Sequence, residues 1–430
     1  MIARLAAGRI HYAWLVAGMT FVLMLGAAGV RSIPGVLFLP LEGEFGWSRA
    51  AISLAVSINL FLFGLCGPFA ASVMERVGMR TMMVAALGLL GAAALATTRM
   101  TAVWQLQLLW GVVVGLGAGA LAGWVAAAVA NRWFVERRGL VVGVLTAANA
   151  TGQLIFLPVV AALVEQRGWR TAVTLPAVVA LVLVPFVWLV IRSFPSDVGL
   201  RPFGARDDGR PIRPRAPLAG NPFARAFAAL GQGVRDRDFR FLAATFFICG
   251  ASTNGLIGTH LIPASIEHGI PDEAAASFLA VIGVFDVVGT TVSGWLSDRF
   301  DSRWLLVWYY SLRGLSLLFL PYAYGTGWFG LALFVVFYGL DWVATVPPTV
   351  RLTADRFGRE NVGTYFAWIS ASHQLGAASI AYGAGALRTW LGDYQAAFML
   401  SGVLCLIAAG LAIRIGRQTR ELVPVATAPA

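Results

Sequence analysis

Two charged stretches, ASVMERVGMR (residues 71–80) and GWLSDRFDSR (residues 294–303), indicate how the whole chain is organised. Each comes at the end of a long apolar run. An acid, the arginine after it and a second arginine four residues further on recur with the same spacing, 223 residues apart. These residues are Glu75, Arg76 and Arg80 in the first stretch and Asp298, Arg299 and Arg303 in the second. A regularity over half the chain length indicates a duplicated architecture.

A second pair of segments repeats with nearly the same offset. GLVVGVLTAANATGQ (residues 139–153), preceded by Phe134, matches VGTYFAWISASHQLG (residues 362–376), preceded by Phe357. Two independent matches in register support two homologous halves rather than a chance recurrence of charges.

Composition places the chain in a membrane, because hydrophobic residues make up 58% of it and charged residues only 12%. Continuous apolar runs of roughly 20 residues are long enough to cross a bilayer as helices, and they do not alternate as barrel strands do. We therefore predict an all-α integral membrane protein with twelve spans in two six-helix bundles. The predicted spans are 12–36, 50–73, 80–98, 104–130, 139–164, 170–192, 240–263, 274–297, 304–323, 328–350, 362–387 and 394–414.

A polar segment separates the sixth predicted span from the seventh. PSDVGLRPFGARDDGRPIRPRAPLAGNP (residues 195–222) is rich in Pro, Gly, Arg and Asp, as a solvated linker would be. We expect an N-terminal six-helix bundle over 1–192, a cytoplasmic linker over 193–239, and a C-terminal bundle with a tail over 240–430.

All 32 basic residues are arginines, and their distribution gives an orientation. Alternating the sides of successive spans puts 25 of them on the side that holds the linker and both termini, and five on the other side. By the positive-inside rule the richer side is cytoplasmic. We therefore expect a multi-pass protein of the cell's inner membrane with both termini inside.

The segment from Gly294 to Arg303 resembles the G-x-x-x-D-R-x-x-x-R signature that the major facilitator superfamily carries between paired helices on the cytoplasmic side. The first copy departs from it, with Ala71 in place of the leading glycine and Glu75 in place of the aspartate. The resemblance implies that the acid and arginines form a cytoplasmic gate that latches one conformation.

Within that superfamily the chain is similar to the monocarboxylate porters and their bacterial oxalate/formate-type relatives. Three features carry this similarity: NRWFVERRGLVVGVLTAANATGQ (residues 131–153), Arg31 ahead of a downstream LEGEFGW segment, and the Phe285-Asp286 pair. The family often has arginine four residues after that acid, where this chain has Thr290. The resemblance implies a transporter of small organic anions.

Several polar residues fall inside predicted spans, where they are costly and mark function by default. Counted from charged span ends at 1.5 Å per residue, Asp286, Arg313 and Asp341 lie about 15–18 Å deep, near the bilayer centre. Residues of comparable depth are Asn149, His373 and Gln374, whereas Arg31 falls in the outer half and His260 near the end of the seventh span.

We interpret these residues as a central substrate site. Arg31 binds a carboxylate, because its planar donors can engage both oxygens, and either Asp286 or Asp341 takes up a proton. The hydrogen-bonding substrate residues are Asn149, His260, His373 and Gln374. The alternative is structural: Arg313 neutralises one of the two aspartates, Arg31 reaches towards the outer interface, and the histidines and glutamine satisfy each other by packing.

The sequence predicts no enzyme, cofactor or metal centre, because its four histidines and three cysteines show no catalytic or metal-binding spacing. The expected partners are a small anionic organic solute, a proton and membrane lipid, with no nucleic acid, and the expected state is a monomer. Two alternatives stay open, an exchanger or exporter of another small solute and a transporter-like receptor. A last expectation is that Pro347-Pro348 bends the tenth span.

Overall fold

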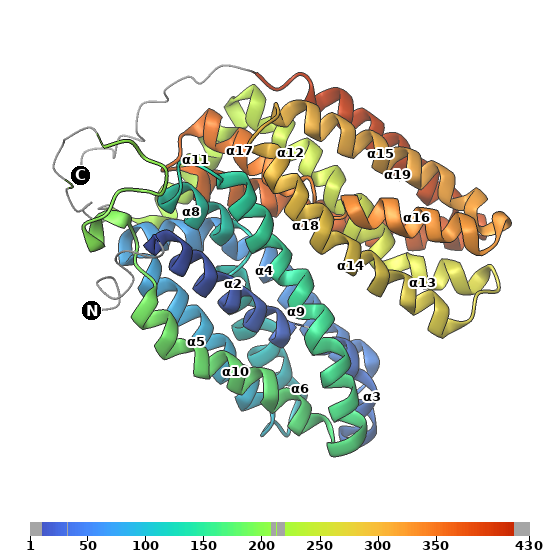
Figure 1. Cartoon of the computed structure of the whole chain (residues 1–430). Coiled ribbons are helices and arrows are strands. Elements are labelled where there is room, and N and C mark those ends of the chain that lie inside the picture. Colours follow the sequence, from blue (N-terminus) through green and yellow to red (C-terminus); the bar gives the residue numbers. More distant parts are fainter. Residues whose placement is uncertain (1–10, 32, 208–211, 213–219, 417–430) are drawn as a thin grey trace. The chain divides into compact units, whose positions relative to one another are not determined.

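The computed structural model describes residues 11–31, 33–207, 212 and 220–416, and most of these residues are helical (Figure 1). The elements are α2 (Tyr12–Arg31), α3 (Pro34–Phe45), α4 (Arg49–Val77), α5 (Met79–Thr97), α6 (Val103–Leu106), the π-helical η1 (Gln107–Val114), α7 (Gly115–Ala120), α8 (Trp124–Trp133), α9 (Arg138–Arg167), α10 (Trp169–Val190), the short 3₁₀ helix η2 (Pro195–Val198), α11 (Pro222–Arg235), α12 (Arg237–Gly250), the π-helical η3 (Ala251–Ile257), α13 (Gly258–Glu267), α14 (Asp272–Ser297), α15 (Ser302–Ala323), the 3₁₀ helix η4 (Tyr324–Thr326), α16 (Trp328–Asp341), α17 (Val346–Phe357), α18 (Val362–Leu391) and α19 (Gln395–Ala412).

Ten helical stretches of the described residues are long and apolar enough to cross a membrane. The predicted spans that coincide with α15 and α18 are not among the ten, since their sequences are more polar. The predicted first span was wrong at its end: α2 ends at Arg31, and the apolar run continues as a separate helix, α3. Pro34 opens α3 and has no backbone N–H with which to continue the hydrogen-bond ladder of α2.

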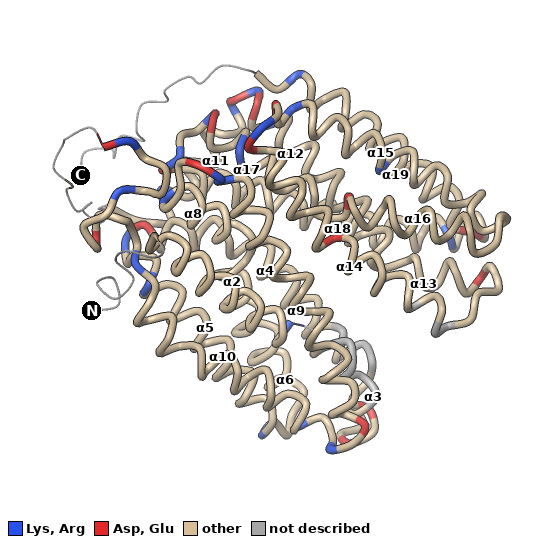
Figure 2. Tube along the Cα trace, viewed as in Figure 1, with Lys and Arg blue, Asp and Glu red and all other residues tan. Residues whose placement is uncertain are grey.

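The chain forms two compact units, and one short segment that interrupts the first unit in the sequence belongs to the second. The first contains residues 1–136 and 148–228, and the second contains residues 137–147 and 229–426. In the first unit α5 lies beside α10, and in the second α15 lies beside α19 along most of its length (Figure 1). In both units the charged residues gather mainly at the helix ends, while the long middle sections carry few of them (Figure 2). This distribution is the one that a bilayer requires.

The start of α9 crosses α14 at very close range inside the second unit. A Cβ atom on Gly143 would stand 2.6 Å from the carbonyl oxygen of Thr290 and 3.1 Å from Cα of Gly294. A Cβ atom on Gly294 would overlap the carbonyl oxygen of Gly139. Glycine at these positions therefore lets the two backbones touch, which explains why a glycine leads the GWLSDRFDSR stretch.

The carboxylate of Asp298 fixes the same crossing. It accepts hydrogen bonds from the backbone N–H groups of Gly139 at 2.8 Å and Leu140 at 3.0 Å. These groups belong to the first turn of α9, where N–H groups have no partner within the helix and a negative charge is favoured. Arg351 of α17 donates to the same carboxylate at 3.4 Å.

We predict that Gly143→Ala lowers the stability of the protein. Alanine is a better helix former than glycine by about 1 kcal/mol, but overpacking against α14 costs about 1–3 kcal/mol. The matched control is Gly410→Ala in α19, where a Cβ atom would meet no heavy atom within 4 Å. Thermal unfolding in detergent should give a lower midpoint for Gly143→Ala than for the control. Equal midpoints would mean that the crossing tolerates a side chain.

Candidate functional site

The tenth predicted span is interrupted at the depth where the sequence places its aspartate. α16 ends at Asp341, α17 begins at Val346, and residues 342–345 form turns. The break comes just before Pro347-Pro348, the pair from which a bend was expected, and these prolines occupy the first turn of α17. A break inside a span frees backbone N–H and C=O groups that lipid cannot satisfy.

Arg313 of α15 satisfies the freed carbonyl groups. Its guanidinium donates to the carbonyl oxygens of Asp341 and of Trp342, the latter at 3.1 Å. Its Nε also donates to the Asp341 carboxylate, Oδ2, at 2.8 Å. The side chain of Arg313 is only 1% exposed. Arg313 therefore pairs with Asp341 rather than Asp286, and it supports the broken helix as well as neutralising an acid.

α14 supports the break from another side. Asp286 accepts a hydrogen bond through Oδ1 from the backbone N–H of Val343 at 3.0 Å and another from the Thr290 hydroxyl at 2.7 Å. The Ser293 hydroxyl donates to the carbonyl oxygen of Ala344. The buried acid that the sequence marked for proton uptake is thus bonded directly to the irregular backbone.

The fourth contact of Arg313 reaches α12. Its Nη1 lies 3.0 Å from Sγ of Cys249, and this thiol lies 3.2 Å from the Thr345 hydroxyl at the end of the break. The His373 ring stands beside the same thiol. The structure therefore brings Asp286, Arg313 and Asp341 into one cluster, with His373 at its edge.

One atom in this cluster is not satisfied. Oδ1 of Asp341 is buried and makes no hydrogen bond within the described part of the chain. Burying a carboxylate oxygen without a partner is costly in its charged form, so a proton on this oxygen would lower that cost.

His373 stands where α12 and α18 touch. A Cβ atom on Gly250 would overlap the carbonyl oxygen of His373, and one on Gly376 would overlap that of Phe247. Gln374 is half-buried on the same helix. His260 lies apart from the cluster: its Nε2 is 2.8 Å from the carbonyl oxygen of Ala381.

The first unit holds the two remaining substrate candidates, Arg31 and Asn149, both of them half-buried. The guanidinium carbon of Arg31 lies 4.0 Å from the centre of the Phe63 ring, a cation–π contact. Among the described residues no carboxylate forms an ion pair with Arg31. The two arginines inside predicted spans therefore differ: Arg313 has its donors engaged with protein groups, and Arg31 rests on an aromatic face.

The first copy of the charged stretch is bonded within the first unit. Glu75 forms an ion pair with Arg132 at the end of α8, and the Arg80 guanidinium lies 4.7 Å from the Trp188 ring centre. Arg76 is exposed at the end of α4.

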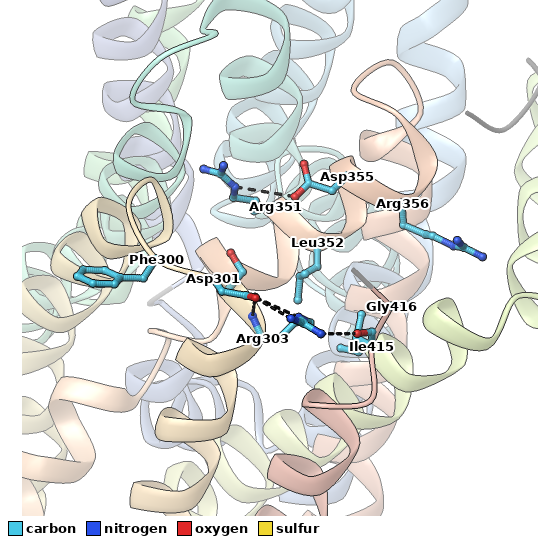
Figure 3. Close-up of a pocket in the computed structure, with 10 residues that line it drawn as sticks. Phe300, Asp301, Arg303, Arg351, Leu352, Asp355, Arg356, Ile415 and Gly416 are labelled. Atoms are coloured by element: carbon cyan, nitrogen blue, oxygen red, sulfur yellow. Dashed lines mark hydrogen bonds and ion pairs between the residues drawn. The ribbon is translucent and has the colours of Figure 1, made fainter. Parts of the chain in front are cut away.

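In the second copy of the charged stretch, neither Arg299 nor Arg303 binds Asp298 within the described part of the chain; each has another partner. Arg303 pairs with Asp301 at 2.7 Å and donates to the carbonyl oxygen of Ile415 at 3.4 Å, so it joins the start of α15 to the chain beyond α19 (Figure 3). Arg299 folds back over the Trp295 ring of its own helix at 3.9 Å. A cavity of about 310 Å³ opens beside Arg303, and Arg351 with Asp355 also lines it (Figure 3).

Sequence reasoning missed the residues that complete the cluster at the break. Cys249 was counted only among three cysteines without catalytic or metal-binding spacing, and Ser293 and Thr345 were not considered. A signal existed for Ser293, since it lies seven residues after Asp286 and so on nearly the same face of α14. None existed for Cys249, whose partners are remote in the chain.

Comparisons with known proteins agree with this architecture. A family model described as the Major Facilitator Superfamily matches residues 19–340 and 241–428. The uncharacterized MFS-type transporter YcxA of Bacillus subtilis (strain 168) is 26% identical over 96% of this chain and 95% of its own length. Monocarboxylate transporter 12 of Xenopus laevis is also 26% identical, over 94% of this chain and 90% of its own length.

Solved structures show the same fold. The fucose:proton symporter FucP of E. coli superposes with a TM-score of 0.70 over 95% of this chain and 100% of its own, at 15% identity. The proton:xylose symporter XylE gives a TM-score of 0.71 over 94% of this chain and 96% of its own, also at 15% identity. The twelve-helix fold and a membrane-transporter architecture are therefore shown, and this chain belongs to the Major Facilitator Superfamily.

Proposed function

We propose that this chain is a secondary active transporter that works by proton-coupled alternating access. Its proposed substrates are small organic anions, and monocarboxylates are the favoured class. We place it in the inner membrane with both termini in the cytoplasm, as the arginine distribution indicates. The similarity to monocarboxylate transporters over nearly the whole chain supports the substrate class. Transport of another small solute by exchange or export is the second candidate, supported by the wider family match.

The contrast between Arg31 and Arg313 is the observation that carries the proposal. A membrane-embedded arginine needs an anionic or polar partner. Arg313 has four such contacts inside its own unit, whereas Arg31 has no carboxylate partner among the described residues. Arg31 is therefore the cation that a substrate carboxylate would meet, with Asn149 as the hydrogen-bonding candidate in the same unit.

The helix break is the candidate site of proton coupling. Arg313 binds the carbonyl oxygens of residues 341 and 342, and Asp286 binds the N–H group of residue 343. A proton added to Asp286 or to Asp341, the ion-pair partner of Arg313, would therefore change the hydrogen bonding of the break directly. An irregular stretch in a span is also where a helix bends most easily. Proton binding and a change of shape in the second unit would then be one event.

Arg31→Ala should weaken the binding of transported anions. Loss of a charged hydrogen bond costs about 1.5–3 kcal/mol, so apparent affinity should fall about tenfold or more. The matched control is Arg237→Ala, which removes an arginine that also rests on an aromatic ring but lies at the first residue of its helix and outside both charged stretches. Uptake into proteoliposomes against substrate concentration measures both. Wild-type affinity of Arg31→Ala for every transported anion would favour a neutral solute instead.

Asp286→Asn or Asp341→Asn should abolish the dependence of uptake on a pH gradient while exchange of labelled solute continues. Asparagine keeps a carbonyl oxygen for the break but does not take up a proton in the pH range tested. Asp301→Asn is the control, because that acid lies at the first turn of α15 and binds Arg303. Uptake and counterflow should be measured across external pH.

Arg313→Ala completes that experiment. It leaves the acid and two carbonyl groups of the break unpaired, so it should destabilise the protein by about 3–5 kcal/mol and reduce its yield more than it alters selectivity. If both aspartate variants keep a normal response to the pH gradient, neither acid couples the proton.

Asp298→Asn should slow the interconversion of inward-open and outward-open states in a protein that stays folded. The variant keeps one acceptor for the first turn of α9 but loses the negative charge that favours that helix end and pairs with Arg351. Asp393→Asn serves as control, because that acid also accepts a hydrogen bond from the first N–H group of a helix, α19, but lies outside the charged stretches. Counterflow exchange at a wild-type rate would show that the α9–α14 contact does not limit the cycle.

A further inference from the structure

The helix α11 (Pro222–Arg235) has three distinct faces. Successive residues turn by roughly 100° around an α-helix, so residues spaced by three, four and seven share a face. The buried face consists of small residues, and the exposed apolar face consists of large ones. The buried residues are Pro222, Ala226, Ala229 and Gly233; the apolar stripe is the exposed Phe223, Phe227 and Val234 with the half-buried Leu230.

The large apolar side chains are the exposed ones. Phe223 is 55% exposed, Phe227 58% and Val234 50%. In water a helix buries its large side chains and turns small or polar ones outward. The reverse arrangement here indicates an apolar neighbour outside the described part of the chain. The third face, with Ala224, Ala228 and Arg235, is exposed as well but carries no large apolar group.

The apolar stripe of α11 continues a surface of the spanning helix α4. The rings of Phe223 and Phe227 lie 5.5 Å and 5.3 Å from the ring of Phe69 near the end of α4. One and two turns further along that face, Leu65 is 38% exposed and Phe61 63% exposed. Because α4 crosses the membrane, an exposed apolar row on it is suited to contact with lipid, and the stripe extends this row onto α11.

A hydrogen bond holds α11 at the end of α4. Nη2 of Arg225 donates to the carbonyl oxygen of Ser72 at 2.8 Å. Ser72 lies one turn beyond Phe69 and two turns beyond Leu65, so α11 sits at the level where the lipid-facing row reaches the polar end of the span. This is the level of lipid headgroups.

Exposed arginines follow the stripe. They are Arg235, Arg237 and Arg240. The acids that alternate with them are already engaged, since Asp236 and Asp238 both bind Arg356, Asp238 at 3.4 Å. Burial alone would raise the pKa of Asp236, but hydrogen bonds from Arg356 and from backbone N–H groups hold that pKa below its ordinary value. Asp236 therefore stays charged and paired, and the exposed charges here are positive.

We propose that α11 lies in the plane of the membrane interface and binds anionic phospholipid. Phe223, Phe227 and Val234 enter the boundary between acyl chains and headgroups, and Arg235 and Arg237 bind lipid phosphates. The lipid surface is favoured over a protein partner because the stripe is continuous with the lipid-facing row of α4. The proposal is independent of the transported substrate.

Depth measurements on the full-length protein test the apolar half of the proposal. Spin labels are placed by Phe227→Cys, Val234→Cys or Ala228→Cys in a Cys66→Ala background, where the remaining cysteines are buried. In lipid nanodiscs the labels at 227 and 234 should favour oxygen over a water-soluble nickel complex about threefold or more relative to the label at 228, roughly 100° away. Equal accessibility to the nickel complex at all three positions refutes a lipid contact. Exclusion of both reagents at 227 and 234 indicates a protein surface and refutes it equally.

The charge half of the proposal is tested by lipid composition. The label at 227 should lie deeper in nanodiscs containing phosphatidylglycerol than in pure phosphatidylcholine, and Arg235→Gln combined with Arg237→Gln should abolish that difference. Arg299→Gln is the matched control, because Arg299 is also exposed and, like Arg237, rests on an aromatic ring of its own helix, but it follows α14 and not α11. Two results would overturn the assignment to anionic lipid. One is an equal depth of the label at 227 in both lipid compositions in the parent protein, and the other is an unchanged depth difference in the double variant.

Discussion

The bonding of Arg313 to the interrupted α16–α17 span is the interaction on which the polar interior of the second unit depends. Inside a bilayer an open turn is tolerated only where protein groups replace the missing helical hydrogen bonds. One guanidinium supplies donors to two carbonyl oxygens and a carboxylate, and Asp286 supplies the acceptor for a freed N–H group. Without these side chains the span would have to be a continuous helix, and no irregular backbone would be present at mid-depth.

The same requirement governs how the helices approach one another. Where a side chain must reach the backbone of a neighbouring helix, the helices have to be close, and glycine allows this. A Cβ atom on Gly289 would overlap the carbonyl oxygen of Leu340, one residue before the break, so α14 carries Asp286 against the turns it supports. At the polar end of the same helix, Gly294 lets α9 come near enough for Asp298 to accept its first N–H groups. The glycines and the buried acids of α14 therefore act together. The glycines let the neighbouring backbones approach closely, and the aspartates accept hydrogen bonds from those backbones.

The sequence was sufficient for the helical membrane fold, whereas the duplicated halves and the depths of the buried charges stay predictions. Hydropathy and residue counts along a helix give position along the membrane normal. They do not measure rotation about the helix axis. From the sequence, Asp286 and Asp341 were therefore equivalent candidate partners for Arg313. In the structure Asp341 forms the ion pair with Arg313, and Asp286 accepts a hydrogen bond from the backbone N–H of Val343. For the same reason nothing in the sequence indicates that Cys249 contacts Arg313 and Thr345. The early end of α2 was also out of reach, since an apolar run that continues past Arg31 gives no sign of a new helix except Pro34.

The geometry of the break also limits how a proton can act there. Arg313 donates four hydrogen bonds to described groups, and only one of them is to the side chain of Asp341. A proton on that carboxylate weakens one charge-assisted bond but leaves the two carbonyl bonds and the thiol contact in place, so the turn is loosened and not released. A proton on Asp286 acts elsewhere, because it weakens the bond to the N–H of Val343 while Ser293 still holds Ala344. Protonation at either site would therefore change the stiffness of the span in steps while its backbone groups stay satisfied, which is the condition for a helix to bend repeatedly inside lipid without exposing unpaired polar groups.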